Sequence, residues 1–487
     1  MARLSRWVWV VAGVLLAVLA ATSTRYGFHR DELYFIVAGS HPALGYPDQP
    51  ALVPLLAWAM HELSSGSPFL LRVPSALASA ATTIIAALVA RELGGRQRAQ
   101  VIAAACTASS GVALAVGHFV TTTTFDLLST TALLWLVIRA VVRRSGPAMV
   151  AAGVVVGVGS EAKPQVVFVA VAVVVTLLLL GPRSVLRSRW TGGGIAAAIV
   201  LAAPYAIWQQ EHGWPQLTVA RNIAGSAEGG RVGFIPFQLV MVSVLLVPVW
   251  VAGLAAPFRR PALRPLRFVP ATYAVLGLAY ILGDGKAYYL ASLYPALLGI
   301  GALPTADWTT RARSRVPLLV GAIAISAVLS AYVALPLLPE RSLQGSAPFA
   351  INPDLGETVG WPRFIETVSR AWKAIPARER SRTAIFTANY GEAGAIDVLG
   401  GSHTLPRAYS GHNGFSEWGR PPETDDHALL LGFDGPADAA PAFADCRRLA
   451  TMRNGVGLEN DEQGLPLLLC RPTAPWSTLW SRLTHFN

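Results

Sequence analysis

Long apolar runs alternate with short polar connections along most of the first 336 residues. About eleven runs reach roughly 17 to 25 residues, the length that a helix needs to cross a hydrocarbon core about 30 Å thick. They cover 7–23, 69–90, 101–118, 126–142, 148–162, 164–181, 193–209, 236–257, 269–283, 287–304 and 317–336. The pattern therefore predicts a polytopic α-helical membrane protein.

Arginine residues gather in every second connection between these runs. The groups are Arg91/Arg96/Arg98, Arg143/Arg144, Arg183/Arg187/Arg189, Arg259/Arg260/Arg264/Arg267 and Arg311/Arg313/Arg315. Lys and Arg accumulate in cytoplasmic loops, and Arg3 and Arg6 precede the first run. We therefore expect a multi-pass protein of the plasma membrane with its N-terminus in the cytoplasm and its C-terminus outside.

Composition agrees with this class of protein. The chain is 53% hydrophobic and only 14% charged, with a mean hydropathy of +0.46. Its formal charge is +11, but the basic residues are scattered between apolar runs instead of forming one basic face. We interpret them as topology signals and contacts to anionic membrane lipids, and we expect no nucleic-acid partner.

The first outward connection, residues 24–68, is unusually long. It contains two short apolar stretches, 32–38 and 51–60, separated by a turn-rich segment. Both stretches are too short to span a bilayer, so helices lying in the membrane interface are expected. The acidic pair Asp31 and Glu32 opens the first stretch, and a structural salt bridge with Arg30 is the alternative to a chemical role.

Ionisable residues collect in the outward connections. They are Asp31, Glu32, His41, Asp48, His61, Glu62, His118, Asp126, Glu161, Lys163, Glu211, His212, Asp284 and Lys286. A charge near membrane depth is costly and usually faces a cavity or a partner, although a residue at a helix end can also extend to water. Together these residues predict a polar cavity that opens outward.

After Pro336 the chain becomes more polar and is punctuated by Pro and Gly. Apolar segments at 383–388 and 427–433 are typical of strands between helical patches. We expect a membrane domain over 1–338 and an external soluble α/β domain over 339–487. Cys446 and Cys470 share this domain, where an oxidising compartment favours a disulfide, while Cys106 lies within an apolar run.

The motifs of the first outward connection resemble those of glycosyltransferase family 39. This family groups the protein O-mannosyltransferases with the aminoarabinose lipid A transferases, on the GT-C fold. The segments that carry the resemblance are 30–35, 41–42, 45–52, 72–75, 123–126, 161–163, 207–215, 285–291, 389–394 and 410–413. The likeness extends over essentially the whole chain and is nearest to an uncharacterised bacterial branch, so it does not define the acceptor.

The resemblance implies transfer of a sugar from a polyprenyl-phosphate donor to a hydroxyl acceptor on the external face, with inversion at the anomeric carbon. Such a transfer needs a base for the acceptor proton. Asp31 matches the family's catalytic aspartate and is the expected base. Glu32 is expected to position the acceptor or the sugar, and Asp126 matches the family's second acidic position.

The departing phosphate needs cationic groups. Arg72, Lys163 and Lys286 are the expected phosphate-binding residues, and an arginine fork suits phosphate oxygens. Tyr288 and Tyr289 are expected along the lipid path, with an interfacial aromatic belt as the alternative. The expected acceptor-binding or cavity-lining residues are Asp48, His118, Glu161, Glu211 and His212.

A metal cofactor is not expected. Some GT-C relatives use a divalent ion, which stays an open possibility, but no tight His or Cys ligand spacing occurs here. Two other classes compete with a transferase. A secondary transporter would commonly show an internal repeat, and none is evident in this chain. A receptor or scaffold would leave Asp31, Asp126 and the basic residues without a task.

Overall fold

The computed structural model describes residues 3–64, 66–225 and 230–487. The chain folds into two compact units. The helical unit contains Met1–Ser23, Arg72–Ile207 and Ile223–Leu335, and the sheet unit contains Thr24–Leu71, Trp208–Asn222 and Pro336–Asn487. The first outward connection, which we expected within the membrane domain, therefore folds in the same unit as the C-terminal part of the chain.

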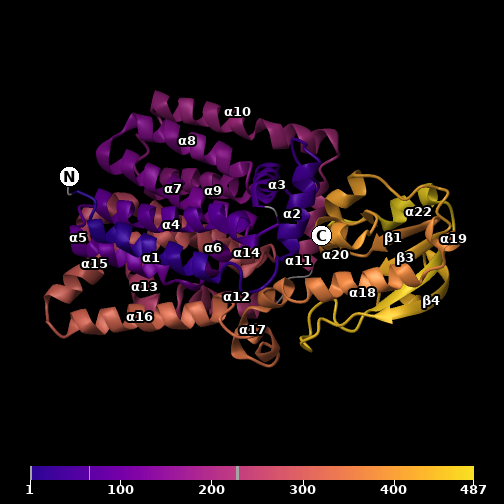
Figure 1. Ribbon diagram of the computed structural model, residues 1–487. Helices are drawn as coiled ribbons and strands as arrows, with labels where there is room; N and C mark the ends of the chain where they lie inside the picture. Colours follow the sequence, from indigo (N-terminus) through magenta and orange to yellow (C-terminus); the bar gives the residue numbers. More distant parts are fainter. Residues whose placement is uncertain (1–2, 65, 226–229) are drawn as a thin grey trace. The chain divides into compact units, whose positions relative to one another are not determined.

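Each apolar run of the sequence coincides with a helix or a pair of helices (Figure 1). The helices are α1 Arg6–Thr22, α4 Pro68–Glu92, α5 Gln97–Ala108, α6 Gly111–His118, α7 Thr122–Arg143, α8 Gly146–Ser160, α9 Gln165–Leu180, α10 Arg189–Glu211, α12 Gly230–Val242, α13 Val247–Arg259, α14 Phe268–Leu282, α15 Tyr294–Thr310 and α16 Arg315–Ala334. The run 101–118 is broken between α5 and α6, where Ser110 caps the second helix. The run 236–257 breaks after α12, where Ser243 has φ 78°.

The number of membrane spans follows less directly from the runs. By length and composition, 5 described helices can cross a bilayer, or up to 7 if each of the two bent pairs forms one span. Helices α1, α8, α9 and α14 have 17, 15, 16 and 15 residues. At about 1.5 Å per residue they are shorter than a typical hydrocarbon core. A total of about eleven spans therefore stays a prediction.

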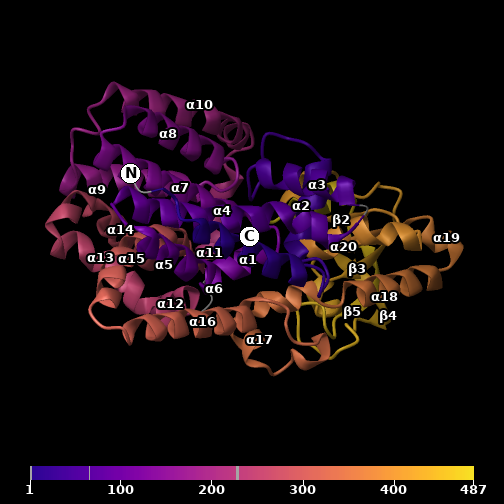
Figure 2. The same ribbon diagram turned by 60° about the vertical axis from the view of Figure 1, so that its left-hand side comes forward.

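Two long helices expose much of their apolar surface. Ile199 and Val200 on α10 are 65% and 69% exposed, and Leu318 and Val328 on α16 are 64% and 68% exposed. Figures 1 and 2 both show these helices at the margin of the helical unit. Contiguous apolar surface of this kind is unfavourable in water and is normal against lipid. The exposure supports a membrane environment.

Helices α8 and α10 pack through glycine. A Cβ atom at Gly153 would lie 1.9 Å from the carbonyl oxygen of Gly194, and one at Gly157 would lie 2.5 Å from the Leu201 side chain. Figure 2 shows the two helices side by side. The spacing of four residues between Gly153 and Gly157 is the small-residue spacing that lets membrane helices approach closely. Its use here is helix packing.

The sheet unit is built around five strands in the order β2-β1-β3-β5-β4. These strands are β1 Thr383–Thr387, β2 Ala408–Ser410, β3 His427–Leu431, β4 Phe443–Thr451 and β5 Pro466–Pro472. Strands β2, β1 and β3 are parallel, whereas β5 is antiparallel to β3 and β4. The expected α/β character of this part is confirmed.

Further helices complete the sheet unit. They include α2 Arg30–Ser40, α3 Leu52–Ser64, α11 Pro215–Gly225, α18 Trp361–Ala374, α20 Tyr390–Leu399 and α22 Trp476–Leu483. Helices α2 and α3 contain the two short apolar stretches of the first outward connection. Side chains from β1, β4 and α22, among them Phe386, Phe443 and Trp476, are buried together in one apolar core.

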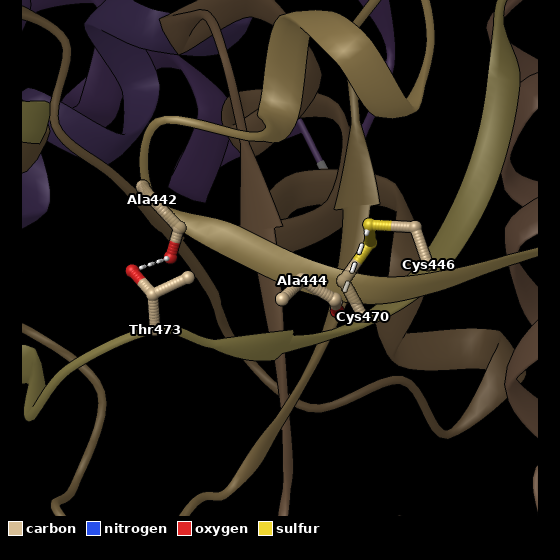
Figure 3. Close-up of a disulfide and its surroundings, with 5 residues drawn as sticks. All are labelled: Ala442, Ala444, Cys446, Cys470 and Thr473. Atoms are coloured by element: carbon tan, nitrogen blue, oxygen red, sulfur yellow. Dashed lines mark hydrogen bonds between the residues drawn. A yellow bond between two sulfur atoms is a disulfide. The ribbon is translucent and has the colours of Figure 1, made fainter.

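A disulfide joins the two strands at the antiparallel edge of the sheet. Cys446 of β4 and Cys470 of β5 are bonded, with Cα atoms 4.1 Å apart and a sequence separation of 24 (Figure 3). The pair lies at a bulge, because the register shifts between Ala444 and Arg447. The pairing expected from the sequence is therefore present.

Loss of this disulfide is expected to destabilise the sheet unit. Closing a loop of this length lowers the entropy of the unfolded chain, which corresponds to about 3 kcal/mol of stability. Replacing Cys446 and Cys470 together by Ala should lower the melting temperature, measured in detergent without reductant. Cys106→Ala is the control, since Cys106 is buried and carries a thiol outside the disulfide. Detection of both cysteines as thiols by non-reducing peptide mapping would contradict the expectation.

Candidate active site

Helix α2 begins with a reciprocal cap that involves one of the two acidic residues. The His29 imidazole accepts a hydrogen bond from the backbone N–H of Asp31 (3.1 Å), and the Glu32 carboxylate accepts one from the backbone N–H of His29 (2.8 Å). Glu32 is 0% exposed. The geometry is that of a capping box, which satisfies backbone donors that the helix leaves without partners. Glu32 therefore serves the helix start.

Asp31 has a different environment from Glu32. Its Oδ1 accepts a hydrogen bond from the Tyr390 hydroxyl at 2.9 Å, and its Oδ2 lies 3.9 Å from Nδ1 of His29. The Asp31 side chain is 30% exposed. One carboxylate oxygen is thus held by a phenol while part of the group stays accessible. This arrangement suits a carboxylate that accepts a proton from a bound molecule.

Arg30 forms ion pairs with the C-terminal part of the chain. Its Nη1 lies 3.3 Å from the Glu357 carboxylate and 2.6 Å from that of Asp461. The structural salt bridge that the sequence left open thus belongs to Arg30 with Glu357 and Asp461. The Asp31 carboxylate instead contacts Tyr390 and His29.

A second carboxylate of the same unit, Asp48, is half-buried beside α2. It accepts a hydrogen bond from the Tyr34 hydroxyl (2.7 Å), and that hydroxyl oxygen accepts one from the backbone N–H of Gly414 (3.0 Å). Burial raises the pKa of Asp48 to about 7, the Tyr34 hydrogen bond opposes the rise, and the charge of Asp31 adds to it. Asp48 consequently titrates near neutral pH.

The helical unit brings together another set of the expected residues. Asp126, in the first turns of α7, is 1% exposed, and Lys163 lies in the connection between α8 and α9. The Lys163 ammonium donates to the Thr123 hydroxyl (2.9 Å) and lies 5.2 Å and 5.3 Å from the ring centres of Tyr288 and Tyr289. These distances are typical of cation–π contacts.

Electrostatics distinguish Lys163 from an ordinary surface lysine. Burial lowers the pKa of the Lys163 ammonium to about 8, the Asp126 carboxylate opposes this effect, and the charge of Lys286 reinforces it. Two cations are therefore held near one carboxylate. An added anion would relieve the repulsion between Lys163 and Lys286, so the group is suited to bind one.

The other expected residues of the helical unit have structural partners. The backbone N–H of Tyr205 donates to Glu161 (3.3 Å). Arg72 is 2% exposed and donates to the Ser23 carbonyl oxygen. His118 is buried at the end of α6. These contacts connect neighbouring helices, and they give Arg72 a role in packing that the sequence did not reveal.

Glu211 is the last residue of α10, and His212 follows it. Each is exposed, and the His212 ring stacks on Trp208 with ring centres 3.9 Å apart. Their assignment as cavity residues stays a prediction.

Two tyrosines and a threonine of the site were not assigned a role from the sequence. Tyr34, Tyr390 and Thr123 each bond to an expected functional residue through a hydroxyl. All three lie within segments that carry the family resemblance, which are 30–35, 123–126 and 389–394. The motifs therefore indicated these residues, but only the fold shows which carboxylate or ammonium each hydroxyl contacts.

A metal site is not formed by the described side chains. Residues 3–64, 66–225 and 230–487 contain no group of three His, Cys, Asp or Glu side chains placed to hold a metal ion. The cationic groups near Asp126 offer charge compensation of a different kind.

Part of the chain matches a known protein family. Residues 48–208 match the model of the family described as dolichyl-phosphate-mannose-protein mannosyltransferase. The match includes Asp48, Asp126 and Lys163, and Asp31 lies ahead of it. A comparison with curated protein sequences finds no match. The match supports the resemblance over residues 48–208, which include the motif segments 72–75, 123–126 and 161–163.

Solved structures define the fold. The chain is similar to ArnT from Cupriavidus metallidurans bound to undecaprenyl phosphate, with 14% identity, a TM-score of 0.59 and coverage of 95% of this chain and 98% of that one. It is also similar to the Archaeoglobus fulgidus oligosaccharyltransferase in complex with zinc and sulfate, with 13% identity, a TM-score of 0.53 and coverage of 88% and 68%.

These comparisons show that the chain has the GT-C fold, and residues 48–208 match a family of mannosyltransferases.

Proposed function

We propose that this chain transfers a sugar from a polyprenyl-phosphate donor to a hydroxyl group on the external membrane face. The observation that carries the proposal is the Asp31 carboxylate, partly exposed and bound on one oxygen by Tyr390. The similar Cupriavidus protein binds undecaprenyl phosphate, and an Archaeoglobus relative of the same fold was solved with an inhibitory peptide and a dolichol-phosphate. These ligands support a lipid-linked donor here.

The proposed reaction is a single displacement. Asp31 accepts the proton of the acceptor hydroxyl while that oxygen forms a bond to the anomeric carbon. The bond between the anomeric carbon and the phosphate oxygen breaks on the opposite side, and its electron pair leaves with the polyprenyl phosphate. The products are an inverted glycoside, a free lipid phosphate and a protonated Asp31 that returns its proton to water.

Charge on the departing phosphate requires stabilisation. Lys163 and Lys286 supply two cations near Asp126, and the rings of Tyr288 and Tyr289 flank Lys163. Preorganised cations stabilise charge that develops in a transition state because they need little rearrangement. Arg72 remains a proposed phosphate ligand, with a smaller share because its guanidinium already bonds to Ser23.

Direct assay tests the proposal. Purified protein in lipid would be supplied with synthetic polyprenyl phosphates carrying different labelled sugars, and release of lipid phosphate would be followed together with label transfer. In parallel, mass spectrometry would compare lipid-linked sugars and envelope glycans of a deletion strain with those of the parent. Accumulation of one lipid-linked sugar and loss of one glycan is the expected result. An unchanged profile, with no turnover of any donor, would refute a transferase role.

The external location of the reaction is a separate prediction. The alternating arginine groups place connections after Arg98, Arg189 and Arg315 in the cytoplasm. Reporter fusions at these positions should be active in the cytoplasm, and fusions after Gly213 and Pro339 should be active outside. A cytoplasmic reporter after Pro339 would overturn the topology and place Asp31 on the wrong side for the proposed donor.

A further inference from the structure

Helix α20 approaches α2 unusually closely at its first turn. Asn389 caps α20, and its side chain accepts from the backbone N–H of Glu392 (3.0 Å). A Cβ atom at Gly391 would lie 2.9 Å from Cβ of Arg30, and one at Gly394 would lie 3.0 Å from the backbone of Leu33. Two glycines three residues apart lie on one helix face. They let α20 rest against the start of α2.

This approach places Tyr390 beside Asp31. The Tyr390 ring lies 4.7 Å from the Tyr34 ring and 4.8 Å from the His412 ring, and the Arg30 guanidinium lies 6.0 Å from its centre. Aromatic rings packed on several sides allow the phenol little freedom. The hydroxyl is consequently directed at Oδ1 of Asp31 (2.9 Å).

The charges around Tyr390 favour donation by its hydroxyl. Burial, and then the charge of Asp31, hold the pKa of Tyr390 well above its usual value, so the phenol stays protonated. Burial lowers the pKa of His412 to about 3, so this neighbouring ring is neutral near pH 7. No other side-chain hydrogen bond to the Asp31 carboxylate is present within the described ranges. The phenol is thus the group that orients this carboxylate.

We propose that Tyr390 is a positioning residue, which holds one oxygen of Asp31 so that the other faces the acceptor hydroxyl. The role of Asp31 as base rests on the proposed function, whereas the contact between Tyr390 and Asp31 does not. The C-terminal part of the chain then helps to orient the catalytic carboxylate, because it contributes Tyr390. The short segment 389–394 combines the cap, the hydroxyl and the two glycines that this requires.

Tyr390→Phe tests the proposal because it removes only the hydroxyl and keeps the ring packing. We expect kcat to fall roughly 10- to 100-fold with the KM for the donor unchanged, since loss of orientation affects the reacting geometry and not donor binding. Tyr26→Phe is the matched control. Tyr26 is also buried in the sheet unit, and its hydroxyl donates to the Leu338 carbonyl oxygen (2.7 Å). Its loss should leave kcat unchanged.

A double-mutant cycle separates positioning from general destabilisation. On the Asp31→Asn background, Tyr390→Phe should reduce the residual kcat by less than twofold, because the carboxylate through which it acts is gone. An equal loss on both backgrounds, or a wild-type kcat for Tyr390→Phe, would overturn the proposal.

A stability measurement distinguishes failure of this inference from failure of the proposed function. If the wild-type protein transfers no sugar, thermal unfolding of Tyr390→Phe, Asp31→Ala and the double variant still reports the contact, because Asp31→Ala removes the oxygen that accepts the Tyr390 hydrogen bond. Coupled shifts in melting temperature, smaller in the double variant than their sum, would support a bond between Tyr390 and Asp31. Additive shifts would refute it, whatever the protein transfers.

Discussion

Asp31→Asn is expected to abolish most sugar transfer while leaving the fold and donor binding intact. The amide keeps the shape of the carboxylate, and its oxygen can still accept the Tyr390 hydrogen bond, but it cannot accept the acceptor's proton. General bases typically contribute ~10² to 10⁴ in rate, so a loss of this size in kcat is expected. The measurement is transfer of labelled sugar from a polyprenyl phosphate by the purified variant in lipid.

Glu32→Gln is the matched control for this substitution. It makes the same chemical change one residue further along, and glutamine can replace glutamate in a capping box. Because Glu32 is 0% exposed and bonds to the backbone of His29, we expect a small loss of stability and little loss of turnover. Near-normal turnover by Asp31→Asn together with an inactive Glu32→Gln would move the base to Glu32. Normal turnover by both variants would contradict the mechanism.

Lys163→Gln is expected to weaken binding of the donor phosphate by roughly 10- to 100-fold. Hydrogen bonds to charged groups contribute about 1.5 to 3 kcal/mol, and each 1.4 kcal/mol is about a tenfold change in affinity. Glutamine retains a donor for the Thr123 hydroxyl but loses the charge that lies over Tyr288 and Tyr289. Binding of polyprenyl phosphate to the detergent-solubilised variant, followed by calorimetry or by retention of labelled lipid, measures the change.

Lys373→Gln is the control for Lys163→Gln. The chain contains three lysines, and Lys373 is exposed near the end of α18 in the sheet unit. Its replacement removes the same charge from a position without a phosphate-binding role, so donor affinity should not change. Equal weakening by both variants would indicate a non-specific effect of net charge. Unaltered affinity in Lys163→Gln would place the phosphate elsewhere.

Substitutions of Lys163 and Arg72 are expected to have different effects. Lys163 is held by Thr123 and by two aromatic rings, whereas Arg72 is committed to a backbone carbonyl. Substitution of Arg72 should therefore lower thermal stability together with activity, while substitution of Lys163 should lower affinity with less effect on stability. The sequence alone assigned both residues the same expected role, because an arginine fork and a lysine ammonium can each bind phosphate oxygens.

Hydrophobic periodicity predicted the helical elements well. The runs at 126–142 and 317–336 became α7 and α16, and the two short stretches of the first outward connection became α2 and α3. Such patterns are local, because a helix satisfies its own backbone and needs only an apolar surface. The sequence did not predict the breaks in the runs 101–118 and 236–257. A serine lies at each break, but serine also occurs within continuous helices, so it does not by itself indicate a break.

The amino-acid sequence by itself determined the membrane class, the family resemblance, the α/β character of the C-terminal part and the pairing of Cys446 with Cys470. Only the tertiary structure decided the roles of the three consecutive residues from Arg30 to Glu32. Arg30 forms ion pairs, Asp31 accepts a phenolic hydrogen bond, and Glu32 caps a helix. Residues adjacent in a helix point in different directions, so their partners come from segments more than 300 residues away or from the helix itself. Periodicity and composition report what each residue is, whereas its chemical role depends on which distant side chain the fold brings to it.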